Sequence, residues 1–158
     1  MTRTLPLRSA LVVLLASLAV APAASARPDS AARLQMIWPA SGTVTTRFGE
    51  WRGSRRHAGI DIGMLRSLGL SSILPGTVEQ VGYVPGYEGY GNVVMVDIGS
   101  GYTLLYAHLS VAHVVPGQWL EAGAPIGQAG CTGSCTGTHL HFELRRNGVP
   151  IDPFPYVR

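Results

Sequence analysis

From Trp38 onward, glycine and proline interrupt the sequence every few residues, and the stretches between them are rich in β-branched side chains. None of these stretches repeats apolar residues with a helical period over a length that would form a dependable helix. Six of them instead have the composition of strands bounded by turn residues. The sequence therefore predicts an all-β fold, with strands at Gly42–Gly49, Gly59–Gly63, Gly76–Val84, Asn92–Gly99, Tyr102–Leu109 and Thr138–Arg146.

Two dipeptides are typical of tight hairpin turns. Ser100-Gly101 separates two predicted strands, and Asn147-Gly148 follows the last one. Both pairs tolerate the positive φ angles that two-residue hairpin loops require. Glycine and proline recur throughout residues 114–130, which favours the turns of a curved sheet or small barrel over a helix. We therefore expect a mainly antiparallel fold, a curved β-sheet or barrel-like sandwich.

The N-terminal segment has the pattern of a secretory signal. Arg3 and Arg8 precede an apolar run, Ala10–Ala21, that is short for a membrane span, and Ala24-Ser25-Ala26 offers small residues for cleavage. An uncleaved membrane anchor is the alternative. The predicted organisation is a signal peptide at residues 1–26, a short arm at 27–37 and one domain at 38–158. The mature domain is then periplasmic, cell-wall-associated or extracellular, with no stable membrane association after cleavage.

The charge of the mature segment excludes one class of partner. Removing Arg3 and Arg8 from the twelve basic residues leaves ten against nine acidic ones, so the formal net charge falls from +3 to +1. No basic run is interleaved with aromatic residues. Nucleic-acid binding is therefore not expected.

The chain contains two cysteines, Cys131 and Cys135. In an oxidising compartment such a pair favours a disulfide, whereas free or metal-bound thiols are the alternative. No further cysteines exist to complete a thiolate zinc site. We predict a short-range disulfide.

Histidines are a second set of candidate metal ligands. His139 and His141 are two residues apart in a predicted strand, so their side chains share one face. In a fully extended chain the Cα atoms of His57 and Asp61 would lie roughly 13 Å apart, too far for their side chains to share an ion. The chain between them must therefore bend. Two imidazoles and a carboxylate suit zinc with an open position for water, and His108 is a further candidate beside that water. The residues alone do not decide which histidines are ligands.

Three motifs occur in order: HAGID from His57, LYAHLS around His108 and GTHLHFEL around His139 and His141. Together they resemble the lysostaphin/LytM-type zinc endopeptidases, which cut peptidoglycan peptides. The resemblance extends from about Trp38 to Val157. It implies the duplicated hybrid motif fold and one zinc ion per domain.

The resemblance also implies roles for five residues. His57, Asp61 and His141 match the zinc ligands, His139 matches the general base, and His108 matches the second catalytic histidine. The expected function is an exported metalloendopeptidase that hydrolyses stem or crossbridge peptides of peptidoglycan. A non-catalytic module that binds the cell wall or activates another hydrolase is the alternative, although such family members have lost ligands. A zinc peptidase of another exported protein also fits the motifs.

The chain departs from this family at a few positions. Serine is common where Cys131 and Cys135 stand, and proline where Thr138 stands; the segment Met64–Gly76 also differs from the usual connection. Glu143 lies on the same strand face as His141, as either a partner of an imidazole or a surface carboxylate. Arg52, Arg55 and Arg56 either contact substrate carboxylates or form a solvated loop. Trp51 and Tyr90 either line a substrate groove or pack within the domain, and His113 is expected at the surface.

Overall fold

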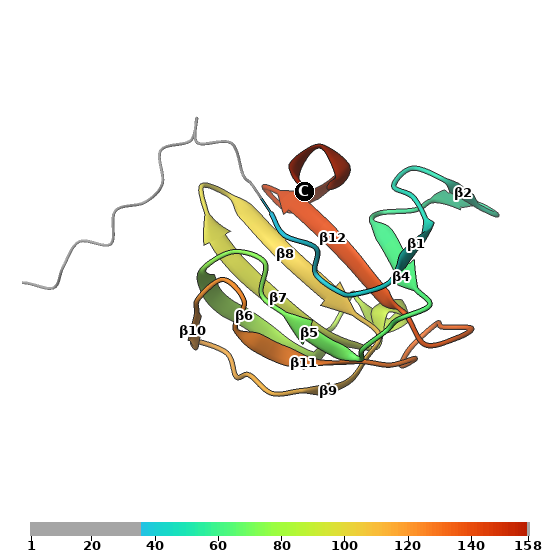
Figure 1. Cartoon of the computed structure of the whole chain (residues 1–158). Helices are drawn as coiled ribbons and strands as arrows, with labels where there is room; N and C mark the ends of the chain where they lie inside the picture. Colours follow the sequence, from blue (N-terminus) through green and yellow to red (C-terminus); the bar gives the residue numbers. More distant parts are fainter. Residues whose placement is uncertain (1–35, 158) are drawn as a thin grey trace, which may run out of the picture.

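The larger of the sheets is antiparallel throughout. A computed structural model describes residues 36–157 of the chain (Figure 1). The larger sheet has the strand order β1-β4-β12-β8-β7-β6-β10, and β13 pairs with β12. Its strands are β1 Thr43–Thr46, β4 Ile60–Gly63, β12 Leu140–Arg146, β8 Tyr102–Ala107, β7 Asn92–Gly99, β6 Gly76–Tyr83, β10 Trp119–Leu120 and β13 Val149–Ile151.

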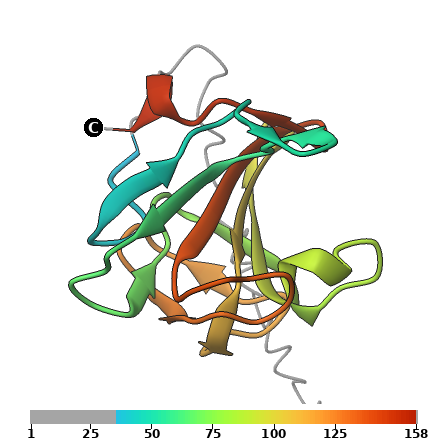
Figure 2. The same cartoon turned by 90° about the vertical axis from the view of Figure 1, so that its right-hand side faces the viewer.

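A smaller sheet packs against one face of the larger one (Figures 1 and 2). It has the order β5-β11-β9, and a separate hairpin of β2 and β3 stands to one side. These strands are β5 Gly69–Ser71, β11 Pro125–Ala129, β9 Leu109–Ala112, β2 Trp51–Arg52 and β3 Arg55–Arg56. The two edge strands of the larger sheet, β1 and β10, do not pair with each other within the described residues, so the sheet does not close into a barrel. The predicted all-β, curved sandwich is confirmed.

The core lies between the two sheets. Leu70 and Ile126 of the smaller sheet belong to the same buried cluster as Leu104, Tyr106 and Phe142 of the larger one. Alternate residues of the strands supply this apolar layer, because side chains of a strand point alternately to its two faces. The face of β12 opposite the core is left free to carry polar groups.

Both predicted hairpin turns are present. Ser100 and Gly101 have φ angles of 54° and 78°, and Asn147 and Gly148 have 50° and 78°. Positive φ at both central residues is the geometry whose twist matches that of the flanking strands. The first turn joins β7 to β8 and the second joins β12 to β13.

The predicted strand Tyr102–Leu109 is interrupted at His108. β8 ends at Ala107 and β9 begins at Leu109. His108 has a φ of 63°, an uncommon conformation for a residue other than glycine. This residue turns the chain out of the larger sheet and into the smaller one, which a local strand pattern does not reveal.

Short 3-10 helices lie at two connections, η1 Glu88–Tyr90 and η2 Phe154–Tyr156. Met36, the first described residue, forms a bridge with Val157 near the C-terminus and is buried in the core. No helix between residues 36 and 157 is long and apolar enough to cross a membrane. The predicted signal peptide and nearly all of the predicted arm lie outside the described residues.

Candidate metal centre

The register between β4 and β12 places Asp61 directly opposite His141. His57 reaches the same place because the chain bends before β4 begins, as the sequence requires. Gly59 makes that bend possible: a Cβ atom at this position would lie 2.2 Å from the carbonyl oxygen of Phe142. The missing side chain therefore lets the first motif press against β12.

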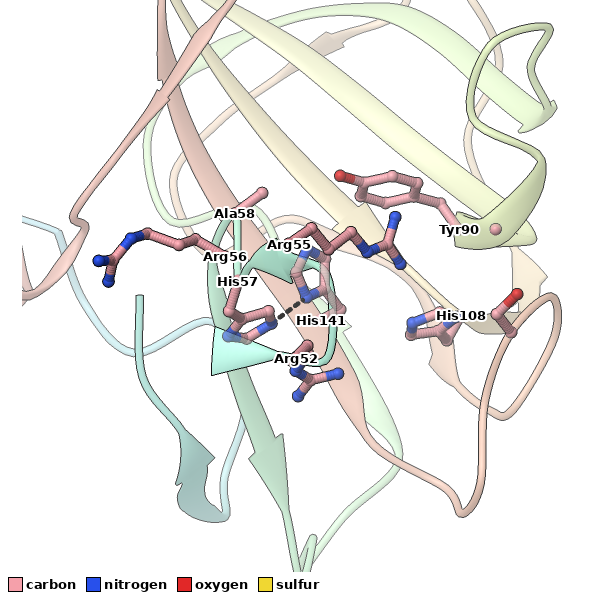
Figure 3. Close-up of a pocket in the computed structure, with 10 residues that line it drawn as sticks. Arg52, Arg55, Arg56, His57, Ala58, Tyr90, His108 and His141 are labelled. Atoms are coloured by element: carbon pink, nitrogen blue, oxygen red, sulfur yellow. Dashed lines mark hydrogen bonds between the residues drawn. The ribbon is translucent and has the colours of Figure 1, made fainter. Parts of the chain in front are cut away.

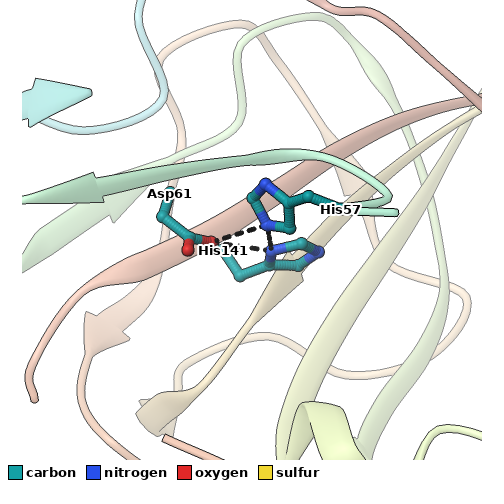
Figure 4. Close-up of side chains that lie close together, drawn as sticks. All are labelled: His57, Asp61 and His141. Carbon is teal, nitrogen blue, oxygen red and sulfur yellow. Dashed lines mark hydrogen bonds and ion pairs between the residues drawn. The ribbon is translucent and has the colours of Figure 1, made fainter. Parts of the chain in front are cut away.

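Three side chains from two distant segments meet at this point (Figure 4). Asp61 Oδ1 lies 2.8 Å from His141 Nδ1 and 3.1 Å from His57 Nε2. The two imidazole nitrogens are 2.9 Å apart. All three residues are buried. The predicted bend thus brings His57 and Asp61 together, and His141 joins them from β12.

The outer nitrogen of each imidazole is already used as a donor. His57 Nδ1 is 2.9 Å from the carbonyl oxygen of Arg47, and His141 Nε2 is 3.0 Å from Glu143 Oε1. A carbonyl or carboxylate oxygen only accepts, so these nitrogens carry the protons of the neutral rings. The inner nitrogens then present lone pairs toward Asp61. Three acceptors facing one another call for a cation between them, and two nitrogens with one oxygen are a donor set suited to zinc.

The surroundings of the cluster keep the Asp61 carboxylate ionised. Burial opposes ionisation of Asp61, but hydrogen bonds and charge from His141 and His57, when either ring also carries a proton on its inner nitrogen, outweigh it and hold the pKa of Asp61 well below its usual range. Arg52 of β2 forms an ion pair with the other oxygen, Oδ2. This ion pair leaves Oδ1 as the carboxylate atom that faces the imidazoles.

Glu143 is fully buried and fixes the outer side of His141. Its carboxylate accepts from the Tyr90 hydroxyl at 2.7 Å and from Arg145 Nη1 at 2.5 Å. Burial opposes ionisation of Glu143, yet the hydrogen bonds from His141 and Tyr90 outweigh it and lower the pKa. Glu143 is therefore a partner of an imidazole rather than a surface carboxylate. Arg145 was not considered from the sequence, although its spacing of two from Glu143 places it on the same strand face.

The other two predicted histidines stand beside the cluster. His139 Nε2 lies 3.8 Å from Asp61 Oδ1, and the rings of His139 and His108 are 4.7 Å apart. Each ring donates from Nδ1 to a carbonyl oxygen: His139 to Gly137 at 2.7 Å, and His108 to Thr132 at 2.8 Å. Burial lowers the pKa of His108 and favours its neutral form. Both rings therefore keep Nε2 as an acceptor.

An open pocket borders the cluster (Figure 3). It provides about 70 Å³, room for roughly two water molecules, so a peptide would have to lie across its open side. Its rim is cationic and carries no carboxylate among the described lining residues. The lining consists of Arg52, Arg55, Arg56, His57, Ala58, Gly89, Tyr90, His108, Ser134 and His141.

The remaining sequence candidates divide between this pocket and the surface. The arginines and Tyr90 are lining residues. Trp51 is 66% exposed outside the lining and packs under Arg56, and His113 is exposed. Cys131 and Cys135 form the predicted disulfide. Ser134, in the loop that this disulfide closes, was missed because a lone serine carries no motif.

An antiparallel β domain with a His-Asp-His cluster beside an open pocket has the features that a metallopeptidase requires. The sequence matches Peptidase family M23 over residues 55–153, and the chain belongs to this family. The resemblance found from the three motifs is thereby confirmed.

Curated relatives of the chain include both an activator and a peptidase. The murein hydrolase activator EnvC of Escherichia coli is 34% identical over 128 residues, which cover 80% of this chain and 30% of EnvC. The DD-carboxypeptidase/endopeptidase Mpg of Neisseria gonorrhoeae is 38% identical over 99 residues, 63% of this chain and 22% of Mpg. The chain thus spans less than a third of either relative's length.

Solved structures resemble about three quarters of the chain. The catalytic domain of the antimicrobial peptidase lysostaphin from Staphylococcus simulans superposes with a TM-score of 0.65 at 28% identity, covering 73% of this chain and 91% of that one. A zinc containing peptidase from Vibrio cholerae gives a TM-score of 0.63 at 28% identity, covering 76% of this chain and 38% of that one.

Proposed function

We propose that this protein is an exported zinc metalloendopeptidase that hydrolyses peptide crosslinks of peptidoglycan. One observation carries the proposal: two imidazole lone pairs and a carboxylate oxygen face one another at 2.8 to 3.1 Å, and both outer imidazole nitrogens are already used as donors. His57, Asp61 and His141 would hold the ion. A bound zinc ion supplies a water of lowered pKa and polarises a carbonyl.

His139 and His108 provide the proton chemistry in this proposal. The Nε2 atom of His139 is an acceptor beside the cluster, so it can take a proton from water and later deliver it to the leaving amine. His108 presents the same kind of acceptor and can orient the water. Once protonated, its Nε2 becomes a donor that stabilises the oxyanion of the tetrahedral intermediate.

The arginines on the rim of the pocket favour a substrate that carries carboxylates. The side chain of Arg52 is engaged by Asp61 and that of Arg56 donates to the carbonyl oxygen of Gly49, whereas the side chain of Arg55 has no hydrogen-bond or ion-pair partner among residues 36–157. Figure 3 shows Arg55 directed over the pocket. Peptidoglycan stem peptides carry carboxylates, which guanidinium groups bind well. Mass spectrometry of the released muropeptides would identify the bond that is cut.

A hydrolase activator is the second candidate function, because relatives such as EnvC carry that name. The complete set of ligands and neighbouring histidines supports the enzyme instead. The two functions predict opposite results with a chelator, since only an enzyme uses the metal for turnover.

Dye release from labelled peptidoglycan separates the two functions. We expect protein purified from the exported fraction to release dye on its own. The mass of the same protein would show whether the signal is cleaved after Ala26. A chelator should abolish the release, because the metal contributes several kcal/mol of transition-state stabilisation, and added zinc should restore it. Release that occurs only together with a second hydrolase, unaffected by chelator, would instead identify an activator.

The buried carboxylate Glu143 gives a second expectation. Glu143→Gln replaces the acceptor that fixes the His141 ring with a weaker one, so zinc affinity should fall about 10- to 100-fold. Competition with a chromogenic chelator measures this change. Glu79→Gln, on the exposed face of β6, is the matched control and should bind zinc like the wild type. Equal affinities for the two variants would remove Glu143 from the site.

A further inference from the structure

The disulfide loop, residues 131–137, contacts both histidines that are not proposed as ligands; the cross-link itself spans Cys131 to Cys135. His108 Nδ1 donates to the carbonyl oxygen of Thr132, and His139 Nδ1 donates to that of Gly137. Cys135 Sγ also lies 3.6 Å from His139 Nδ1. By contrast, His57, Asp61 and His141 make no hydrogen bond to this loop within the described part of the chain. The loop therefore contacts the two proposed proton-transfer groups and not the three proposed ligands.

Thr132 fastens the loop to the body of the domain. Its hydroxyl donates to the carbonyl oxygen of Leu109 at 2.9 Å and accepts from the amide of Asn92 at 2.9 Å. A Cβ atom on Gly133 would lie 2.4 Å from the amide nitrogen of Gly91, so the two segments are in close backbone contact. The Thr132 carbonyl that receives the His108 proton is therefore held on both sides.

The disulfide closes the part of the loop that contains this carbonyl. Cys131 and Cys135 enclose Thr132, and their Cα atoms are 5.2 Å apart. Gly133 would otherwise give this short segment many conformations. A cross-link removes much of that freedom, although Cys131 itself is exposed and accessible to a thiol.

We propose that the disulfide loop is a positioning element that fixes the Nδ1-protonated tautomer of His108 and His139, so that opening the disulfide lowers turnover without releasing the metal. The opening step is thiol–disulfide exchange. A dithiol reductant gives up two electrons and two protons, the Cys131–Cys135 bond becomes two thiols, and the reductant becomes a cyclic disulfide. This inference rests on the proposed hydrolase function.

Two variants of the loop test the proposal against a matched control. Cys131→Ser with Cys135→Ser removes the cross-link, and Thr132→Val removes both hydroxyl hydrogen bonds. Thr136→Val makes the same change at an exposed position of the same loop whose hydroxyl has no hydrogen bond among the described residues. Thr132→Ser keeps the hydroxyl and should behave like the wild type.

The measurements are kcat, bound zinc and the ¹⁵N resonances of the His108 ring, which report the protonated nitrogen. We expect the cysteine and Thr132→Val variants to lose about tenfold to a hundredfold in kcat, keep one zinc ion and show a mixed His108 tautomer. Dithiothreitol should lower kcat of the wild type to that of the cysteine variant, and should leave the cysteine variant and its zinc unchanged.

Other outcomes overturn the proposal. A wild-type kcat and a single His108 tautomer in the cysteine variant would show that the disulfide does not position the ring. Loss of zinc from that variant would make the loop a general brace of the site. If the wild type hydrolyses nothing, the proposed function fails, while the tautomer and zinc measurements still decide the role of the loop.

Discussion

The His141→Ala variant is expected to lose both its zinc and its hydrolytic activity. His141 contributes one of three buried donor atoms, and its removal leaves an incomplete set in which Asp61 and His57 face an empty position. Because the metal supplies several kcal/mol of transition-state stabilisation, activity should fall by at least about 10³-fold. Metal analysis after gel filtration, together with dye release, measures both losses.

The control for this change is His113→Ala, since His113 is exposed and lies away from the cluster. It should retain one zinc ion and full activity. Circular dichroism of His141→Ala is expected to keep the β-sheet spectrum, because the apolar core lies on the other face of β12. A folded His141→Ala protein that still binds stoichiometric zinc would remove His141 from the ligand set.

The second large effect is expected at His139, with the opposite pattern. His139→Ala removes an imidazole whose free Nε2 stands beside the cluster but leaves the three inner donor atoms in place. Loss of a general base typically lowers kcat about 10²- to 10⁴-fold. Zinc content should remain at one ion per molecule. Single-turnover kinetics with a crosslinked muropeptide, alongside metal analysis, would measure the two properties separately.

The pair of adjacent histidines makes this comparison informative. His139 directly precedes β12 and His141 lies within it, with one residue between them, so nonspecific damage to this end of β12 would affect both variants alike. Full hydrolytic activity in purified His139→Ala would contradict its assignment as the base. Loss of zinc in the same variant would make it a ligand instead.

Local signals in the sequence predicted most of the larger sheet. The strand Asn92–Gly99 has the predicted bounds, because turn residues flank a continuous β-branched run. The hairpins at Ser100-Gly101 and Asn147-Gly148 follow from the φ angles that these residues tolerate. By contrast, β5 and β9 were not predicted as separate strands. Both are short, and both are defined by pairing with β11, a partner distant in sequence.

The sequence predicted the residues of the candidate site but not the protonation of their rings. Residue types indicated a cluster of imidazoles and a carboxylate, and the resemblance to a known family assigned His57, Asp61 and His141 as ligands. The structure brings these three together, as that assignment requires. The tautomers, however, depend on the carbonyl oxygens of Arg47 and Thr132. Every residue has such a carbonyl, so no pattern of side chains could have indicated them.

His108 belongs both to the junction between the two sheets and to the lining of the pocket. Its left-handed backbone carries the chain from one layer of the sandwich to the other, and its ring stands at the rim of the pocket. Any sliding of one layer over the other would therefore displace the His108 ring. In the proposed hydrolase, a bound peptide would therefore have to adjust to the position of this ring, which the junction of the two sheets fixes.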